Sequence, residues 1–323
     1  MSVTPLIVTH NNFDPGGLGS AYHSMRFGYY HGFEDMGLSP RFVRHSDIGN
    51  YESNSLFLLT WDDYNYLDDA AFEVIKHSLH VVMVNVWFEG IEKEITSHGA
   101  PSPMISMDTI QRIVDSKPAF VWGLHPEEQL GFYEKWNDAG CKVVSLPPAC
   151  DTTRYHPSDS GEFEDVEMGL VASYRVYKTA QYEEYLWPYE DKLKIWSHSP
   201  WPRCYQGLIE NDKVRALYQN ATVCPTISEP MLPYLWALPE RPFTILGSGG
   251  LTVLDCVPIY SLLFGRDEML MPNTVGEYHE MVGVALHDSQ LNQKYRDAGY
   301  RAVMKRHTCE HRVRKLLKEL GNV

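Results

Sequence analysis

No stretch of the sequence approaches 18 consecutive apolar residues, so we expect no membrane span. The N-terminal segment MSVTPLIVTHNN lacks the apolar length, the basic residues and the cleavage site of a signal peptide. Positive charge is also scarce, because 28 Lys and Arg oppose 42 Asp and Glu for a formal net charge of -14. Nucleic acid and anionic membrane surfaces both require basic protein surface, so this composition disfavours them as partners.

Paired cysteines and several catalytic motifs are absent as well. The six cysteines show no CxxC spacing and lie mostly in apolar runs, which favours free thiols in a reducing compartment and hence a cytoplasmic protein. The nucleophile elbow GxSxG and the phosphate loop GxxxxGK are missing, which disfavours serine hydrolases and P-loop kinases. No DxD occurs, since the acidic pairs at 62–63 and 68–69 are contiguous.

The sequence contains one known metal-binding motif. His307 to His311 spell HxxEH, the inverted zinc-peptidase motif, which needs a further ligand downstream. Only 12 residues follow His311, and the flanking Lys and Arg residues would repel a dication. We therefore expect no metal site, and a basic terminal helix instead.

Short β-rich apolar runs recur along the chain, and segments of helical character separate them, as in a βαβ-built parallel sheet. Several runs are apolar nearly throughout, which is typical of strands buried on both faces. The predicted strands are 5–10, 41–45, 55–61, 80–87, 119–125 and 142–148, then 166–173, 192–198, 221–228, 250–256 and 268–272. The predicted helices are 18–36, 67–78, 107–115, 127–139, 211–219 and 240–247, with helical structure from 274 onward.

The length indicates two domains, because 323 residues exceed what one core usually supports. A stretch rich in Pro, Ser and acidic residues interrupts the strand-helix rhythm at 147–165. We predict an N-terminal Rossmann-like domain at 1–150, a linker at 151–165, a C-terminal Rossmann-like domain at 166–305 and a terminal helix at 306–323.

A glycine loop follows the first predicted strand. Gly16, Gly17 and Gly19 precede a helix, where glycine lets a ligand approach the backbone and the helix N-terminus offers N–H groups. The spacing is GGxG, not GxGxxG, and no acidic residue ends the second strand, which disfavours a dehydrogenase. The alternative is a tight turn that binds no ligand.

The second half carries basic residues where a doubly wound sheet places ligands, beyond the carboxyl ends of its strands. Arg175 and Lys178 follow its first strand, and Arg241 lies near the start of a helix. Such cations in an otherwise acidic protein suit a diphosphate. The alternative for Arg175 and Lys178 is a solvated face paired with Glu183 and Glu184.

Taken in order, these elements resemble the GT-B glycosyltransferases. PGGLGSAYHSM (15–25) resembles the glycine loop of glycogen-synthase-like transferases, and PPACDTTRYHP (147–157) resembles their interdomain phrase N-G-V-D-x-x-x-F-x-P. MGLVASYRVYK (168–178) resembles the first strand and basic loop of the donor domain. RPFTILGSGGLTVLD (241–255) and RHTCEHRV (306–313) resemble the phrases R-x-F-E-I-L-A-x-G-G and H-T-Y-x-x-R of the CgeB-like, or spore-maturation, branch.

The resemblance implies the GT-B fold, in which two Rossmann-like β/α/β domains face each other across a cleft and the final helix packs back on the first domain. It also implies an acceptor in the N-terminal domain and a nucleotide-diphosphate sugar, such as a UDP-sugar, in the C-terminal domain. Carried over onto this sequence, Arg175 and Lys178 contact the diphosphate, Arg241 assists, and Gly16 and Gly17 face the donor.

One position departs from the family pattern. Thr244 stands where the family usually has a Glu that holds the ribose hydroxyls, which leaves donor affinity and nucleotide choice open. Glu240 or Glu229 could compensate.

The implied transfer needs stabilisation of the leaving diphosphate, which cations supply without a metal or other cofactor. An inverting reaction also needs a general base, and the strand ends offer Asp14, Asp62, Glu89 and His125. Each of these could equally be an ordinary loop carboxylate or a hydrogen-bonded histidine. A retaining reaction needs no protein nucleophile, so the stereochemistry stays open.

Sugar transfer to a glycan or small-molecule acceptor is the first hypothesis. The second is transfer to a modified, hydroxymethylated DNA base, which the acidic balance disfavours and the basic C-terminal segment mildly favours. A third is a sugar-nucleotide-binding protein without catalysis, which the Thr244 departure suggests. A fourth is a non-transferring enzyme of the same fold, such as a sugar-nucleotide epimerase.

Overall fold

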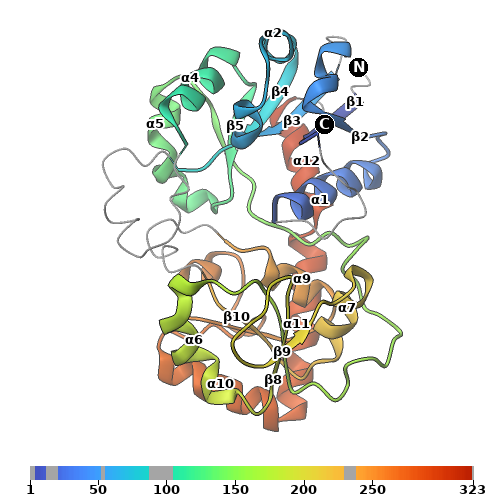
Figure 1. Cartoon of the computed structure of the whole chain (residues 1–323), viewed down its shortest axis with the longest axis vertical. Coiled ribbons are helices and arrows are strands. Elements are labelled where there is room, and N and C mark those ends of the chain that lie inside the picture. Colours follow the sequence, from blue (N-terminus) through green and yellow to red (C-terminus); the bar gives the residue numbers. More distant parts are fainter. Residues whose placement is uncertain (1–3, 12–20, 52–54, 87–104, 229–237, 322–323) are drawn as a thin grey trace. The chain divides into compact units, whose positions relative to one another are not determined.

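The computed structural model describes residues 4–11, 21–51, 55–86, 105–228 and 238–321. The chain divides into two compact units (Figure 1). The first unit holds the elements up to Pro147 and the C-terminal segment from Cys309, and the second holds Pro148–Thr308. None of the helices in the described ranges combines the length and the apolar character that crossing a membrane requires.

A six-stranded parallel sheet forms the centre of the first unit. Its strands are β1 (Thr4–Thr9), β2 (Arg41–Arg44), β3 (Ser55–Thr60), β4 (Leu79–Met83), β5 (Phe120–Gly123) and β6 (Val143–Ser145). Their spatial order is β2-β1-β3-β4-β5-β6, and every pairing is parallel. Because β1 lies between β2 and β3, the carboxyl ends of β1 and β3 form a topological switch point, where open α/β sheets bind ligands.

Helices flank this sheet. They are α1 (Ala21–Asp35), α2 (Asp69–Lys76), α4 (Met107–Ser116), α5 (Glu134–Asp138) and α12 (Cys309–Glu319), with the short 3-10 helices η1 (His45–Asn50), η2 (Trp61–Asn65) and η3 (Glu127–Tyr133). Phe33 of α1 and Val313 of α12 share a buried cluster with Ile7 of β1, and α1 and α12 lie side by side (Figure 1). The two helices approach closely because Gly32 lacks a Cβ, which would stand 2.9 Å from the carbonyl oxygen of Cys309.

Local chemistry sets where several helices begin. The carboxylate of Asp68 accepts a hydrogen bond from the Ala71 backbone at the start of α2, and a serine at residue 106 caps α4 in the same way. The prediction of one helix at 127–139 is wrong, because this segment forms η3 followed by α5. Gly131, a poor helix former, lies inside η3.

The second unit contains two smaller parallel sheets. The strands are β7 (Met168–Val171), β8 (Leu193–Trp196), β9 (Tyr205–Gly207), β10 (Cys224–Thr226) and β11 (Thr252–Leu254). One sheet has the order β7-β8-β9 and the other pairs β10 with β11, while a parallel bridge between Met168 and Val223 joins β7 to the start of β10. Thus β7 lies between β8 and β10, which makes the ends of β7 and β10 a second switch point.

The helices of the second unit are α6 (Thr179–Tyr185), α7 (Asn211–Asn220), α9 (Arg241–Gly247), α10 (Val275–His287) and α11 (Ser289–Arg306), with η4 (Val176–Lys178), η5 (Trp187–Tyr189) and η6 (Pro258–Leu262). The strand predicted at 268–272 is reduced to a single bridge between Leu270 and Val253. Where the chain enters and leaves this unit, the Cys150 backbone N–H donates to the His307 carbonyl at 2.8 Å. The phrases at 147–157 and 306–313 are therefore hydrogen-bonded to each other.

Candidate functional site

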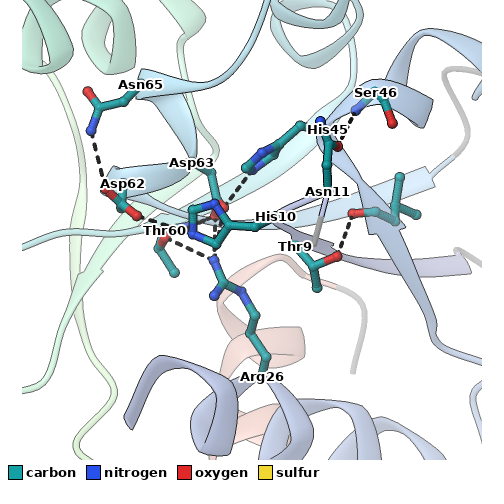
Figure 2. A network of polar contacts seen from close by, with 11 residues as sticks. Thr9, His10, Asn11, Arg26, His45, Ser46, Thr60, Asp62, Asp63 and Asn65 are labelled. Atoms are coloured by element: carbon teal, nitrogen blue, oxygen red, sulfur yellow. Dashed lines mark hydrogen bonds and ion pairs between the residues drawn. The ribbon is translucent and has the colours of Figure 1, made fainter. Parts of the chain in front are cut away.

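Polar side chains follow three neighbouring strands at the switch point of the first unit. His10 comes directly after β1, His45 directly after β2, and Asp62 and Asp63 lie in η2 directly after β3. Because parallel strands end at the same edge of a sheet, these side chains meet there, as Figure 2 shows. The order of the strands brings them together, and no spacing motif connects them in the sequence.

His10 and Asp62 form the outer pair of this cluster. Nε2 of His10 lies 3.3 Å from Oδ2 of Asp62, and the two side chains are 33% and 31% exposed. Asn65 donates a hydrogen bond to the other Asp62 oxygen at 3.3 Å. Histidine exchanges a proton near neutral pH, and a carboxylate beside it stabilises the imidazolium that forms. The pair is therefore suited to general-base chemistry on a group approaching from solvent.

Asp63 forms the centre of an inner, buried network. Its carboxylate accepts hydrogen bonds from Arg26 at 2.9 and 3.1 Å, from His45 at 2.9 Å, and from the backbone and hydroxyl of Thr60 at 2.6 and 2.9 Å. Burial works to raise the pKa of Asp63, but the hydrogen bond from His45 and the charge of Arg26 outweigh it, and the pKa is lowered. This network fixes η2 and hence the position of Asp62 (Figure 2).

Two aromatic rings pack against His10 of the outer pair. The rings of His45 and Tyr66 are stacked, with centroids 5.5 Å apart and planes 7° apart. The His10 ring stands edge-on to both, with centroid distances of 5.1 Å to His45 and 4.9 Å to Tyr66. His10 is therefore held by a carboxylate and by two aromatic rings.

Of the other three predicted bases, the structure describes one. His125 is buried, and its Nδ1 lies 2.7 Å from the hydroxyl of Tyr133. Asp14 and Glu89 lie outside the described residues, as do Gly16 and Gly17 of the glycine loop. All of these roles stay predictions. Sequence reasoning missed His10, although its place directly after a buried strand was a signal that could have identified it.

In the second unit, Lys178 links the loops that follow β7 and β10. Its Nζ donates to the carbonyl oxygen of Ile227 at 3.0 Å, and its side chain is buried. Lys178 is therefore not part of a solvated face, which removes that alternative for this residue. Beside it, Ser228 donates from its backbone and its hydroxyl to Asp255, both at 2.7 Å.

Asp255 is a buried carboxyl directly after β11. Burial raises its pKa to about 6, although the hydrogen bonds from Ser228 and the charge of Lys178 work to lower it. The cluster at this switch point thus combines a buried cation with a carboxyl that titrates near neutral pH.

The remaining predicted donor residues lie at the start of η4 or in and next to α9. Arg175 is exposed and precedes η4, while Glu240 and Arg241 are partly buried at the start of α9. Thr244 is 4% exposed, and its hydroxyl donates to the carbonyl of Arg241 within the same helix. The structure places each of these residues, and their contacts to a donor stay predictions.

The glycines after α9 have a packing explanation. A Cβ on Gly247 would stand 2.2 Å from the Cys150 sulfur, and one on Gly250 would stand 2.0 Å from the Tyr218 carbonyl oxygen. Gly249 has φ +78°, the left-handed conformation that commonly ends a helix. Packing and helix termination are sufficient reasons for the phrase GSGG, without any ligand.

The HxxEH letters are divided between two helices. His307 is the C-cap of α11. Its Nε2 lies 3.1 Å from the Leu263 carbonyl oxygen, and its ring packs on the ring of Phe264 with centroids 4.7 Å apart. His311 belongs to α12. In the part of the chain that the structure describes, no three His, Cys, Asp or Glu side chains are grouped to hold a metal ion. Metal independence stays a prediction.

A known protein family matches the sequence of part of the chain. Residues 178–318 match a family model described as glycosyl transferase-like. This segment includes Lys178, Arg241 and Asp255. No curated protein matches the sequence of the chain.

Solved structures match the whole chain. Sucrose-phosphate synthase from Thermosynechococcus elongatus has a TM-score of 0.65 at 8% identity, covering 99% of both chains. HepE from Anabaena in complex with UDP and glucose has a TM-score of 0.64 at 9% identity, covering 99% of this chain and 100% of that one. The T4 phage β-glucosyltransferase in complex with UDP-glucose has a TM-score of 0.59 at 10% identity, covering 98% and 97%.

At such low identity the likeness shows the fold. The predicted GT-B fold is confirmed, with parallel α/β sheets throughout. The family match adds that residues 178–318 are similar to glycosyl transferases. The assignment to the CgeB-like branch rests on the two phrases alone and stays an interpretation.

Proposed function

We propose that this chain, which has the fold of the GT-B glycosyltransferases, transfers a sugar from a nucleotide-diphosphate sugar to a hydroxyl of a glycan or small-molecule acceptor. The observation that carries the proposal is the His10–Asp62 pair at the switch point of the first sheet, in a chain whose residues 178–318 match a glycosyl transferase-like family. All six cysteines are free thiols, which supports a cytoplasmic location as part of the proposal.

A UDP-sugar is the proposed donor. Two proteins of the same fold are described in complex with UDP-glucose or with UDP and glucose. Lys178 is the first candidate for the diphosphate contact, because it lies at the switch point of the second unit, and Arg175 and Arg241 are the next. Cationic side chains stabilise a leaving diphosphate, so the reaction requires neither a metal nor another cofactor.

We assign the general base to His10. Its imidazole takes the proton of the acceptor hydroxyl while that oxygen bonds to the anomeric carbon of the donor sugar. The bond from the anomeric carbon to the diphosphate breaks, and the diphosphate leaves with the electron pair. Asp62 stabilises the imidazolium until it returns its proton to solvent. Such a single displacement inverts the anomeric configuration, so NMR of the product tests the assignment.

A modified DNA base is the second candidate acceptor, because a DNA-modifying β-glucosyltransferase shares the fold with a TM-score of 0.56. The formal net charge of -14 weighs against it, since DNA-binding surfaces are basic. Salt-dependent binding to duplex DNA with hydroxymethylcytosine, and sugar transfer to it, would support this acceptor.

A thermal-shift screen of nucleotide-diphosphate sugars against the full chain tests the donor. A ligand that binds only the native state raises the unfolding midpoint by mass action, and we expect at least one UDP-sugar to do so. Lys178→Ala should lose that shift. The absence of a shift with every sugar nucleotide would contradict the proposal. Binding without transfer or hydrolysis would instead indicate the non-catalytic binding protein.

A further inference from the structure

Tyr66 places an aromatic ring at the solvent-exposed side of the His10–Asp62 pair. The residue is 57% exposed, a large fraction for an aromatic side chain of a folded chain. One face of its ring stacks on His45. His10 is nearly equidistant from the two rings, so it lies beside the stack and not on the outer face of Tyr66.

The buried network holds this ring in place. The Tyr66 backbone N–H donates to the carbonyl oxygen of Asp63 at 2.9 Å. His45, against which the ring packs, is itself 5% exposed and hydrogen-bonded to the Asp63 carboxylate. An exposed ring that is already ordered loses little conformational entropy when a ligand covers it.

We propose that the outer face of Tyr66 is the platform on which a neutral sugar acceptor stacks, with one of its hydroxyls presented to His10. The inference rests on the proposed function and specifies its acceptor. A pyranose has an apolar C–H face and a rim of hydroxyls, and tyrosine offers a matching apolar ring with a polar tip. The ring centroids of Tyr66 and His10 are only 4.9 Å apart, so a sugar stacked on Tyr66 is close enough to present a hydroxyl to His10.

The charges around Tyr66 favour a neutral acceptor over a nucleic acid. The exposed carboxylates of Asp68 and Asp69 follow it closely in the chain, and Asp62 is partly exposed beside His10. The nearby cation Arg112 is already engaged. It donates to the Leu67 carbonyl oxygen at 2.9 Å, and its guanidinium lies over the ring of Phe72. Carboxylates in this position repel a phosphate backbone.

Acceptor kinetics test the platform. Wild type, Tyr66→Ala and Tyr66→Trp are assayed with a panel of nucleotide-diphosphate sugars as donors and methyl glucopyranosides and galactopyranosides as acceptors. Tyr66→Ala should raise the acceptor KM by about fivefold, and Tyr66→Trp should restore it, because stacking contributes about 1 kcal/mol. The donor KM should not change, because the platform contacts the acceptor. Met107→Ala, which removes a side chain of similar exposure at 55%, is the matched control.

The possible outcomes distinguish failure of the Tyr66 platform from failure of the proposed glycosyl transfer. An unchanged acceptor KM in Tyr66→Ala would overturn the platform. Transfer to hydroxymethylated duplex DNA and to none of the glycosides would overturn the neutral acceptor while the proposed glycosyl transfer stands. If wild type neither binds nor hydrolyses any sugar nucleotide, the proposed function fails, and the platform fails with it. Unfolding midpoints of the variants show whether Tyr66 substitutions alter folding.

Discussion

Nε2 of His10 lies 3.3 Å from Oδ2 of Asp62, at the edge where β1 and β3 end. The next residue, Asp63, points into the protein and is fully buried between Arg26 and His45. Two adjacent carboxylates in one short helical turn thus have different surroundings. We assign the outer one to chemistry and the inner one to holding the turn.

Removing the base should slow sugar transfer strongly and leave donor binding unchanged. We expect His10→Ala to lower kcat by about 10²- to 10⁴-fold, the usual contribution of general-base catalysis. Asp62→Asn should cause a smaller loss, because the imidazole remains. Rates of diphosphate release in the presence of acceptor measure kcat, and thermal shift measures donor binding. His77→Ala is the control, since His77 is 74% exposed and pairs with Glu73. Wild-type turnover in His10→Ala would remove His10 from the mechanism.

Substitution of the two neighbouring aspartates should affect the unfolding free energy very differently. Asp63→Asn breaks a buried ion pair and leaves Arg26 without its carboxylate, which should cost about 3–5 kcal/mol of unfolding free energy. Asp62→Asn should cost less than about 1 kcal/mol, because its pair with His10 is partly exposed. Urea denaturation of both variants measures the difference.

The pH dependence follows from the lowered pKa of Asp63. Its stabilisation is present above the ordinary value of 3.8 and is lost as pH falls through the lower folded value. The gap between wild type and Asp63→Asn should therefore persist down to about pH 4. Equal stabilities for the two asparagine variants would contradict the assignment of the inner carboxylate.

The raised pKa of Asp255 should make the folded state less stable as pH rises. Its pKa is raised from 3.8 to about 6, so the folded state binds more protons than the unfolded state between these values. Relative to Asp255→Asn, wild type should lose up to about 3 kcal/mol of unfolding free energy as pH rises from about 4 to about 6. Chemical denaturation at several pH values measures both proteins. Parallel stability curves would show that Asp255 does not titrate in this range.

Lys178 should contribute to donor affinity. Hydrogen bonds to charged groups contribute about 1.5–3 kcal/mol, so Lys178→Ala should raise the donor Kd by about 10- to 100-fold in calorimetric titration. Arg203→Ala removes another cation of the second unit, which is exposed and paired with Glu190. That control should bind normally. Equal effects in the two variants would indicate a general charge effect and not a diphosphate contact.

Two glycines should respond in opposite directions to an added methyl group. In Gly250→Ala the new Cβ would stand 2.0 Å from the Tyr218 carbonyl oxygen, so backbone must move, and we expect a loss of about 3 kcal/mol. Gly283 lies within α10 with open space where its Cβ would be, and Gly283→Ala should stabilise by about 0.5–1 kcal/mol. Denaturation midpoints measure both changes. A tolerated Gly250→Ala would reopen a ligand role for the GSGG phrase.

The GT-B fold was predictable because parallel strands are buried on both faces. Their apolar runs therefore stand out from the sequence, as do the helical segments between them. Among the short strands, β9 was not predictable, because its three residues carry no apolar run. The apolar residues Met269–Met271 predicted a strand at 268–272, but only Leu270 pairs. Pairing partners far along the chain, and not local composition, decided these cases.

The site was only partly predictable. The sequence predicts Asp62 as a candidate because it follows a buried strand, whereas the first predicted strand, 5–10, ends on His10 and gives no sign of a base there. The inner network joins Asp63 to Arg26 and His45, which lie 37 and 18 residues away in sequence, with no pattern to connect them. Only the order of the strands brings these residues to one edge.

The most direct measurement is the release of nucleotide diphosphate from a panel of nucleotide-diphosphate sugars, with methyl glycosides as acceptors, by wild type and His10→Ala. We predict that wild type releases diphosphate and forms a new glycoside, and that His10→Ala binds the same donor but forms about 10²- to 10⁴-fold less product per unit time. Release at the wild-type rate by His10→Ala, or no release by wild type with any donor, would contradict the proposal.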